Sequence, residues 1–202
     1  MSDGVLELNG ISEEILSELS YKSKLNISLK SNMHYFPKDE LLQELFNMAD
    51  WYDEQEILSD IPLDYRVKSH ESIARKYERY YPDHQVRKVF NDTLGFRAFC
   101  DSYRDVLNIK DTVFKIVDMS AGKANDDGYR GVHLYFQLDN RHYPIEIQYN
   151  TLYDRQFNNW LHEYVYKKDY PLSVGQKLRQ NYENGLIKNS DDFMEALKLC
   201  VI

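Results

Sequence analysis

The stretches VHLYFQL (132–138) and YPIEIQY (143–149) decide the fold of this chain. Both are rich in β-branched and aromatic residues, a composition that is typical of strands. The polar residues Asp139 to His142 separate them, so the pattern predicts a hairpin. Two earlier strand-like runs lie at 95–100 and 112–117. The sequence therefore predicts a small sheet in the second half of the chain.

Helical patterns lie on both sides of these strands. Apolar residues recur at helical spacing, with start and stop signals such as Ser12, Pro37 and Pro62. The predicted helices cover 12–29, 37–61, 69–80, 101–107, 151–168, 173–184 and 190–200. The fold class expected is α+β, a small mixed β-sheet flanked by N- and C-terminal helices. We expect one domain over 1–202, with N-terminal helices in 1–62, a core in 63–168 and C-terminal helices in 169–202.

Composition narrows the class of protein. The chain has 202 residues, 43% of them hydrophobic, which suits one good core. It has no run of eighteen apolar residues, so we expect no membrane span, and its first residues lack the apolar region of a secretory signal. The two cysteines, Cys100 and Cys200, favour free thiols and a cytoplasmic location. A net charge of −8 argues against a general nucleic-acid coat, although it allows a local basic patch.

Two acids are candidates for a metal site. Glu146 alternates with Ile145 and Ile147, so it points to the opposite face of its strand together with Gln148. Taken alone, that polar face favours solvent exposure, and Asp92 alone favours a turn cap ahead of Gly95. Taken together, two such acids could hold one Mg²⁺ that keeps waters and substrate phosphates in its other positions.

Cations precede these acids in the chain. Lys68, Ser72 and Lys76 are spaced four apart, so on a helix they would share one stripe that could meet a triphosphate. Arg66 and Arg75 add to the positive charge. The alternative is a solvated charged face, which is the more usual meaning of such a run.

The loop GYRGVH (128–133) offers an aromatic side chain between glycines. A loop tyrosine such as Tyr129 can stack on a purine, or it can cover the edge of the core. His133 could donate to a phosphate, although a lone strand histidine is more often structural.

In this order, the fragments resemble the synthetase domain of RelA/SpoT-type alarmone synthetases in its small stand-alone form. The resemblance runs from about residue 65 to 168. It rests on RVKSHESIARK (66–76), DTLGFR (92–97), GYRGVH (128–133) and EIQ (146–148). Four motifs in one order are far more specific than any single one.

The resemblance implies a nucleotidyltransferase-like sheet and transfer of pyrophosphate from ATP to a ribose 3′-hydroxyl. It implies that Asp92 and Glu146 hold Mg²⁺ and that Glu146 also helps to take the hydroxyl proton. The remaining implied roles are adenine stacking by Arg66 and Arg97, contact with ATP phosphates by Lys68, Ser72, Lys76 and His133, and acceptor binding by Tyr129, Gln148 and Arg130.

Three departures from the usual family pattern lie on the acceptor side. Asn150 replaces an arginine, Gly131 replaces a serine, and Asp126 and Asp127 precede Tyr129. The loss of an arginine and the gain of two carboxylates should weaken binding of the polyphosphate of a free GDP or GTP, because like charges repel.

The departures favour the toxic branch of the family, whose members pyrophosphorylate the 3′-CCA end of tRNA and are usually paired with an antitoxin protein. A basic patch for the acceptor stem could come from Lys22, Lys24 and Lys30 with Lys167 and Lys168, although ordinary surface lysines explain them equally well. The alternative function is a (p)ppGpp or related alarmone synthetase, with a guanine nucleotide as its partner. A catalytically silent nucleotide- or partner-binding domain ranks third.

Overall fold

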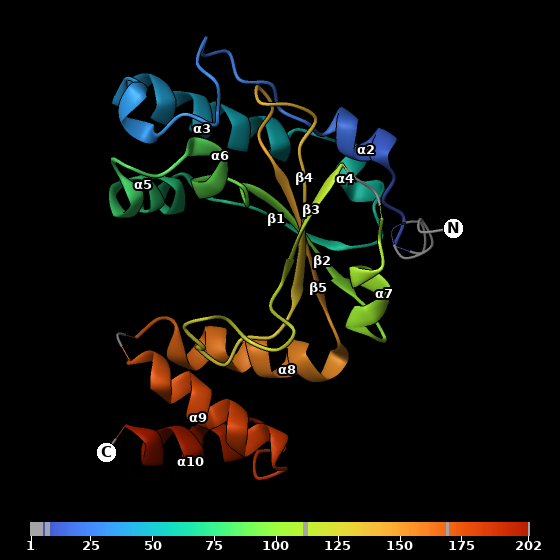
Figure 1. The fold of residues 1–202 in the computed structure, drawn as a ribbon, viewed down its shortest axis with the longest axis vertical. Helices are drawn as coiled ribbons and strands as arrows, with labels where there is room; N and C mark the ends of the chain where they lie inside the picture. Colours follow the sequence, from blue (N-terminus) through green and yellow to red (C-terminus); the bar gives the residue numbers. More distant parts are fainter. Residues whose placement is uncertain (1–5, 7–8, 111–112, 169, 202) are drawn as a thin grey trace. The chain divides into compact units, whose positions relative to one another are not determined.

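The computed structural model describes residues 6, 9–110, 113–168 and 170–201. The elements, drawn in Figure 1, are α2 (Glu13–Glu18), η1 (Met33–Tyr35), α3 (Lys38–Asp53), α4 (Ile57–Asp60), β1 (Asp64–Val67), α5 (His70–Tyr80), α6 (Val86–Val89), β2 (Leu94–Phe99), α7 (Tyr103–Leu107), β3 (Phe114–Asp118), β4 (Val132–Phe136), β5 (Ile145–Asn150), α8 (Leu152–Trp160), η2 (Leu161–Val165), α9 (Leu172–Glu183) and α10 (Ser190–Cys200). No helix among these residues is long and apolar enough to cross a membrane.

The five strands form one mixed sheet in the order β1-β2-β5-β4-β3. The predicted hairpin is present as β4 and β5, and the predicted strand at 95–100 is β2. Strand β1 was not predicted. It pairs antiparallel with β2, with Tyr65 opposite Phe96. The predicted α+β class, a mixed sheet flanked by helices, is confirmed.

Strand β5 is central, and both of its faces are buried. Ile145, Ile147 and Tyr149 are inaccessible on one face, and Glu146 and Asn150 are nearly so on the other. A strand with neighbours on both edges and cover on both faces forces its polar residues into contact with other protein groups. Glu146 and Asn150 are therefore held by hydrogen bonds to other protein groups.

The first predicted helix, 12–29, is wrong beyond residue 18. Helix α2 ends at Glu18, and the chain after it runs extended beside the hairpin turn, where Ser23 N donates to the Arg141 carbonyl at 2.7 Å. The reason is the buried Glu44 of α3. Its carboxylate accepts from the Ser23 hydroxyl and the Lys24 amide, both at 2.7 Å, and this holds the segment out of a helix.

Two further helix predictions need correction. The helix predicted over 69–80 is α5, but Ser69 is its N-cap, so Lys68 lies before the helix and shares no helical stripe with Ser72 and Lys76. The helix predicted over 151–168 is α-helical only to Trp160 and continues as the π-helical turn η2.

The chain divides into two compact units. The first comprises 1–98, 108–116 and 134–148, and the second comprises 99–107, 117–133 and 149–202. In the first unit, α3 packs beside α5 (Figure 1). In the second, α9 packs beside α10 around a cluster that includes Phe157, Leu178 and Phe193. The predicted division at residues 62 and 168 stays a prediction.

Candidate functional site

A small cavity of about 50 Å³ in the first unit gathers most of the predicted donor-side residues. Strands β1, β2 and β5 and the residues beside them supply its walls. The lining residues are Arg66, Lys68, Asp92, Gly95, Arg97, Glu146 and Gln148. Two carboxylates and three cations thus meet in one space, although they come from segments up to 80 residues apart in the chain.

Asp92 lies between two lysines. Its carboxylate accepts hydrogen bonds from Lys68 Nζ at 2.9 Å and from Lys76 Nζ at 2.8 Å. Burial alone would raise the pKa of Asp92, but the attraction of the two ammonium groups outweighs it and holds the pKa below its ordinary value of 3.8. The carboxylate therefore stays ionised at neutral pH and holds both ammonium groups close together.

Glu146 is only 5% exposed, so the expectation of a solvent-facing strand residue is wrong. Its Oε1 accepts from the Tyr135 hydroxyl at 2.8 Å, and its Oε2 accepts from Gln148 Nε2 at 2.6 Å. Gly95 leaves room beside it, since a Cβ at that position would lie 3.4 Å from Oε2. Two donors therefore fix the orientation of this carboxylate.

Tyr135 was missed by the sequence reasoning. It lies on β4 between Leu134 and Phe136, which are buried on the opposite face. The alternation along β4 was a signal that this tyrosine shares a face with His133. That it reaches Glu146, eleven residues away across the hairpin, depends on the pairing of β4 with β5.

The arginines of the cavity come from paired strands. Arg66 on β1 lies opposite Gly95, and Arg97 on β2 lies opposite Asp64. Both line the cavity. Ser72 does not line it, and its hydroxyl accepts from Ser69 at 3.0 Å near the start of α5.

The two carboxylates fit a magnesium site that a substrate completes. Mg²⁺ is usually held by one or two carboxylates together with waters and substrate phosphates. Asp92 and Glu146 supply that number of acids, and within the described residues no cluster of three or more acids, histidines or cysteines forms a metal cage. Each Asp92 oxygen already accepts one lysine hydrogen bond, so the ion would share this carboxylate with the lysines or displace one of them.

Tyr129 belongs to the second unit and is half-buried. Its hydroxyl lies 2.7 Å from His133 Nε2, and the two rings meet edge to face. The ammonium of Lys123 lies 4.9 Å from the centre of the tyrosine ring. The structure thus joins Tyr129 and His133, for which we predicted separate acceptor and ATP roles.

The two acids of the Tyr129 loop are paired with cations of the same loop. Arg130 donates to both oxygens of Asp126, at 2.7 and 3.0 Å, and Lys123 pairs with Asp127 at 2.7 Å. The hydrogen bond from Arg130 lowers the pKa of Asp126. Each acid is therefore paired with one cation, Asp126 with Arg130 and Asp127 with Lys123.

Residues 65–170 match the family described as "Region found in RelA / SpoT proteins". This region is slightly more than half of the chain. The chain belongs to the RelA/SpoT family. It is a RelA/SpoT-type pyrophosphokinase domain, similar to the alarmone synthetases.

Several solved structures resemble this RelA/SpoT protein at low identity. Small alarmone synthetase 1 from Bacillus subtilis, bound to its product pppGpp, is 22% identical over 80% of this chain and 89% of its own, with a TM-score of 0.45. The same enzyme bound to AMPCPP is 19% identical over 81% and 91%, with a TM-score of 0.38. A GTP pyrophosphokinase family protein from Streptococcus pneumoniae is 21% identical over 82% and 87%, with a TM-score of 0.40. No curated protein matches the chain.

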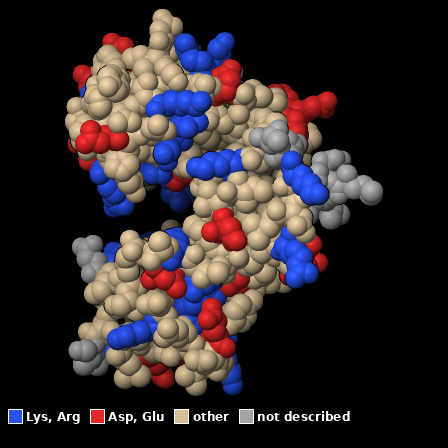
Figure 2. Space-filling view, viewed as in Figure 1, with Lys and Arg blue, Asp and Glu red and all other residues tan. Residues whose placement is uncertain are grey.

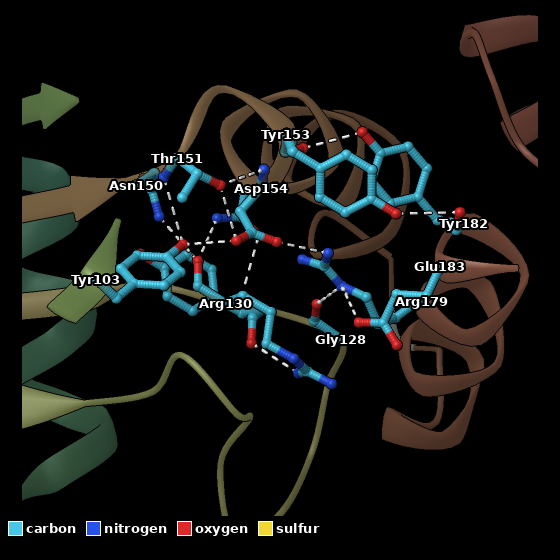
Figure 3. A network of polar contacts seen from close by, with 12 residues as sticks. Tyr103, Gly128, Arg130, Asn150, Thr151, Tyr153, Asp154, Arg179, Tyr182 and Glu183 are labelled. Atoms are coloured by element: carbon cyan, nitrogen blue, oxygen red, sulfur yellow. Dashed lines mark hydrogen bonds and ion pairs between the residues drawn. The ribbon is translucent and has the colours of Figure 1, made fainter. Parts of the chain in front are cut away.

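In this RelA/SpoT domain, buried side chains hold the backbone on both sides of Tyr129 (Figure 3). The carbonyl of Gly128 accepts from Arg179 Nε at 2.8 Å. The carbonyl of Arg130 accepts from Asn150 Nδ2 at 2.8 Å and from Asn158 Nδ2 at 2.7 Å. We call Arg179, Asn150 and Asn158 the loop clamp.

Arg179 is the centre of the loop clamp. It is 1% exposed, and its NH1 donates to Asp154 Oδ1 at 2.7 Å. Asp154 in turn accepts from the hydroxyls of Tyr103 at 2.7 Å and Thr151 at 3.0 Å (Figure 3). A buried ion pair whose acid has two further donors is costly to disrupt, because a single loss leaves the other charge unpaired.

Glycines allow helix α9 and strand β5 to approach the loop closely. A side chain at Gly175 of α9 would overlap the carbonyl of Asp127. A Cβ at Gly131 would lie 2.7 Å from both Asn150 Nδ2 and the Tyr129 hydroxyl, closer than real Cβ contacts. Two departures from the family pattern, Gly131 and Asn150, are therefore coupled by space.

Proposed function

We propose that this chain transfers the β,γ-pyrophosphate of ATP to a ribose 3′-hydroxyl, and that the acceptor is the 3′-CCA end of tRNA. The observation that carries the transfer is the single cavity shared by Asp92, Glu146 and three cations. Little covalent chemistry is asked of the protein in such a reaction, which depends on positioning and charge stabilisation.

Glu146 is the proposed base. Its carboxylate would take the proton of the acceptor 3′-hydroxyl while that oxygen forms a bond to the β-phosphorus of ATP. The bond from the β-phosphorus to the bridging oxygen of the α-phosphate would break, and AMP would leave with both bonding electrons. Tyr135 and Gln148 donate hydrogen bonds to the carboxylate and so orient it for the proton transfer.

The cations would receive the phosphates of ATP. Lys68 and Lys76 both pair with Asp92. When ATP binds, the two lysines would contact its phosphates, and Asp92 would help to hold Mg²⁺. Bound Mg²⁺, held by Asp92 and Glu146, would neutralise charge on the transferred group. Arg66 and Arg97 are the proposed partners of the adenine.

The acceptor proposal rests on the Tyr129 loop. Its two cations, Lys123 and Arg130, are balanced by the two acids Asp127 and Asp126, so these four residues offer no net positive charge to a terminal 5′ polyphosphate. Asn150, which stands in the usual place of an arginine, donates to the backbone instead. A nucleoside without its own polyphosphate, such as the terminal adenosine of tRNA, fits this loop better than free GDP or GTP.

Incubation with γ-labelled ATP tests the acceptor directly. We expect label on deacylated tRNA and much less on GDP or GTP at equal concentration. Periodate-oxidised tRNA, which has lost the 3′-hydroxyl, is the matched control and should stay unlabelled. Label on the guanine nucleotide with none on tRNA would refute the tRNA acceptor and favour the alternative, a (p)ppGpp synthetase. That alternative is favoured by one finding, since a similar protein was solved with pppGpp.

Toxicity and partners are part of the same proposal. Expression of the protein in the cytoplasm of a bacterium should arrest growth of the cells. The Glu146→Gln variant should not arrest it. An antitoxin protein, if its gene is expressed together with this chain, should restore growth and bind the purified protein. Absence of transfer to every acceptor would leave the third reading, a silent nucleotide- or partner-binding domain.

A further inference from the structure

A second cavity, of about 310 Å³, lies in the first unit. It is several times larger than the cavity that contains Asp92 and Glu146, which we call the donor-side cavity. Helix α6, strand β3 and the β4–β5 hairpin supply its walls. Its lining residues are Arg87, Lys88, Asn91, Val113, Phe114, Lys115, Tyr135, Gln137 and Pro144. We call it the α6 pocket. None of the predicted site residues lines it.

The chemistry of the α6 pocket suits an anion. Arg87, Lys88 and Lys115 bring three positive charges, and no acid is among its lining residues. Within the described part of the chain, none of these three cations pairs with a carboxylate, whereas Lys68 and Lys76 both pair with Asp92. Asn91 adds an amide group that can donate hydrogen bonds, whereas the amide of Gln137 already donates to the His142 carbonyl at 2.8 Å. Cations gathered without an internal counter-charge favour a multiply charged ligand such as phosphate.

Tyr135 connects the α6 pocket to the catalytic carboxylate. Its ring lines the pocket, and its hydroxyl donates to Glu146 Oε1 at 2.8 Å. On the other oxygen, Glu146 contacts Gln148 in the donor-side cavity. The proposed base thus lines the donor-side cavity, where residues expected to hold ATP lie, and accepts a hydrogen bond from a side chain that lines the α6 pocket.

Positive charge continues beyond the pocket. The amide of Arg87 donates to the Leu29 carbonyl at 2.9 Å, and the amide of Val86 donates to the Ser31 carbonyl at 3.2 Å. Lys30 lies between those two residues in the chain and is exposed. Figure 2 shows Lys and Arg side chains gathered over the region of α5 and α6 in this unit.

We propose that the α6 pocket, which Tyr135 links to Glu146, binds phosphate groups of the acceptor substrate. The proposal rests on the proposed function, because it needs an acceptor hydroxyl at Glu146. The phosphates could belong to the phosphodiester backbone of an RNA 3′ end or to the 5′ polyphosphate of a nucleotide. In either case Arg87, Lys88 and Lys115 would lower the KM for the acceptor and leave ATP binding unaffected.

Charge-removing variants test the pocket. Arg87→Gln, Lys88→Gln and Lys115→Gln are made singly and as a triple variant, with Lys198→Gln on the exposed side of α10 as the matched control. Binding of deacylated tRNA, GTP and AMPCPP is measured over a range of salt concentrations, and thermal melting checks that each variant folds. We expect the tRNA Kd to rise about three- to tenfold for each cation removed, with the salt slope falling by about 0.7 per lost phosphate contact.

The arms of the experiment separate the sources of phosphate. Weaker binding of tRNA alone assigns the pocket to a phosphodiester, and weaker binding of GTP alone assigns it to a nucleotide tail. Equal weakening of AMPCPP would overturn the inference, because the pocket would then serve ATP. Unchanged tRNA and GTP binding in a folded triple variant would also overturn it.

Failure here can be told from failure of the proposed function. The wild-type protein is assayed for pyrophosphate transfer in parallel, with tRNA and GTP as acceptors. Transfer by the wild type with unaltered acceptor KM in the triple variant refutes only the pocket. Absence of transfer by the wild type refutes the proposed function, and the binding measurements then still decide whether the pocket holds phosphate.

Discussion

The donor-side cavity and the loop clamp around Tyr129 are held by different kinds of contact. In the cavity, the ionic contacts join groups that a ligand could separate: Lys68 and Lys76 are partly exposed and would exchange one anion, Asp92, for another. In the loop clamp, the donors are buried side chains directed at the backbone, as in the bond from Arg179 to the Gly128 carbonyl. The first region is assembled for exchange of ionic partners, and the second for a fixed conformation.

This difference predicts how a substitution in each region affects activity and stability. A site whose ions exchange partners can lose one contact and keep its fold, while its chemistry suffers. A loop held by a buried arginine should lose stability first and activity as a consequence. The predictions that follow separate these two outcomes.

Glu146→Gln gives the largest expected effect. The amide keeps the size of the carboxylate but cannot take a proton, so we expect pyrophosphate transfer to fall by about 10²–10⁴-fold. AMPCPP binding measured without Mg²⁺ should change little, and thermal melting checks that the variant folds. Gln148→Ala, which removes one orienting donor, serves as a milder comparison. A Glu146→Gln enzyme that retains full activity would exclude Glu146 as the base.

Arg179→Met should act on stability. It removes the charge that pairs with Asp154 and the donor to Gly128, so we expect a loss of about 3–5 kcal/mol in the free energy of unfolding, measured with urea. The matched control is Lys177→Met on the exposed side of the same helix, which should lie within about 0.5 kcal/mol of wild type. Equal stabilities for the two variants would contradict the role of the loop clamp.

Asp92→Asn should show a pH signature. At pH 7 it should cost about 1.5–3 kcal/mol of stability, because two partly buried lysines lose their anion. The pKa of Asp92 is lowered in the folded protein, so the wild-type advantage is complete above 3.8, the ordinary value, and is lost as pH falls through the folded pKa below it. Urea unfolding at several pH values down to the acid limit of folding measures this. A constant difference across that range would contradict the ion pair.

Tyr129→Ala sharpens the comparison on the acceptor side. Loss of the ring should weaken acceptor use by about 1–3 kcal/mol if the ring stacks on a base. Tyr129→Phe keeps the ring and loses the hydroxyl that contacts His133, so its effect should be smaller. The measurement is KM for the acceptor and for ATP in each variant. Equal losses for both substrates would argue against an acceptor role.

The local parts of the fold could be predicted from sequence. Alternation about Ile145 and Ile147 located Glu146 on its face, and the spacing from Ser69 to Tyr80 located α5. Strand β1 could not be predicted, since its four residues are mostly exposed and show no alternation. Its pairing with β2 is what makes it a strand.

The contacts that decide the site are long-range, and periodicity carries no signal for them. Glu44 holds Ser23 and Tyr143, which lies 99 residues away, and so converts a predicted helix into an extended segment. Arg179 reaches Gly128 across 51 residues. For Asp92, the resemblance pointed to the residue, but nothing in the sequence indicated that its two oxygens hold two lysines.

The close approach of Gly131 to Asn150 also constrains how such a protein could evolve. A serine at 131 would need the Asn150 amide and the Tyr129 hydroxyl to move, and a longer side chain at 150 would disturb the bond to the Arg130 carbonyl. The residue at 131 and the residue at 150 therefore each limit which side chain the other position can hold.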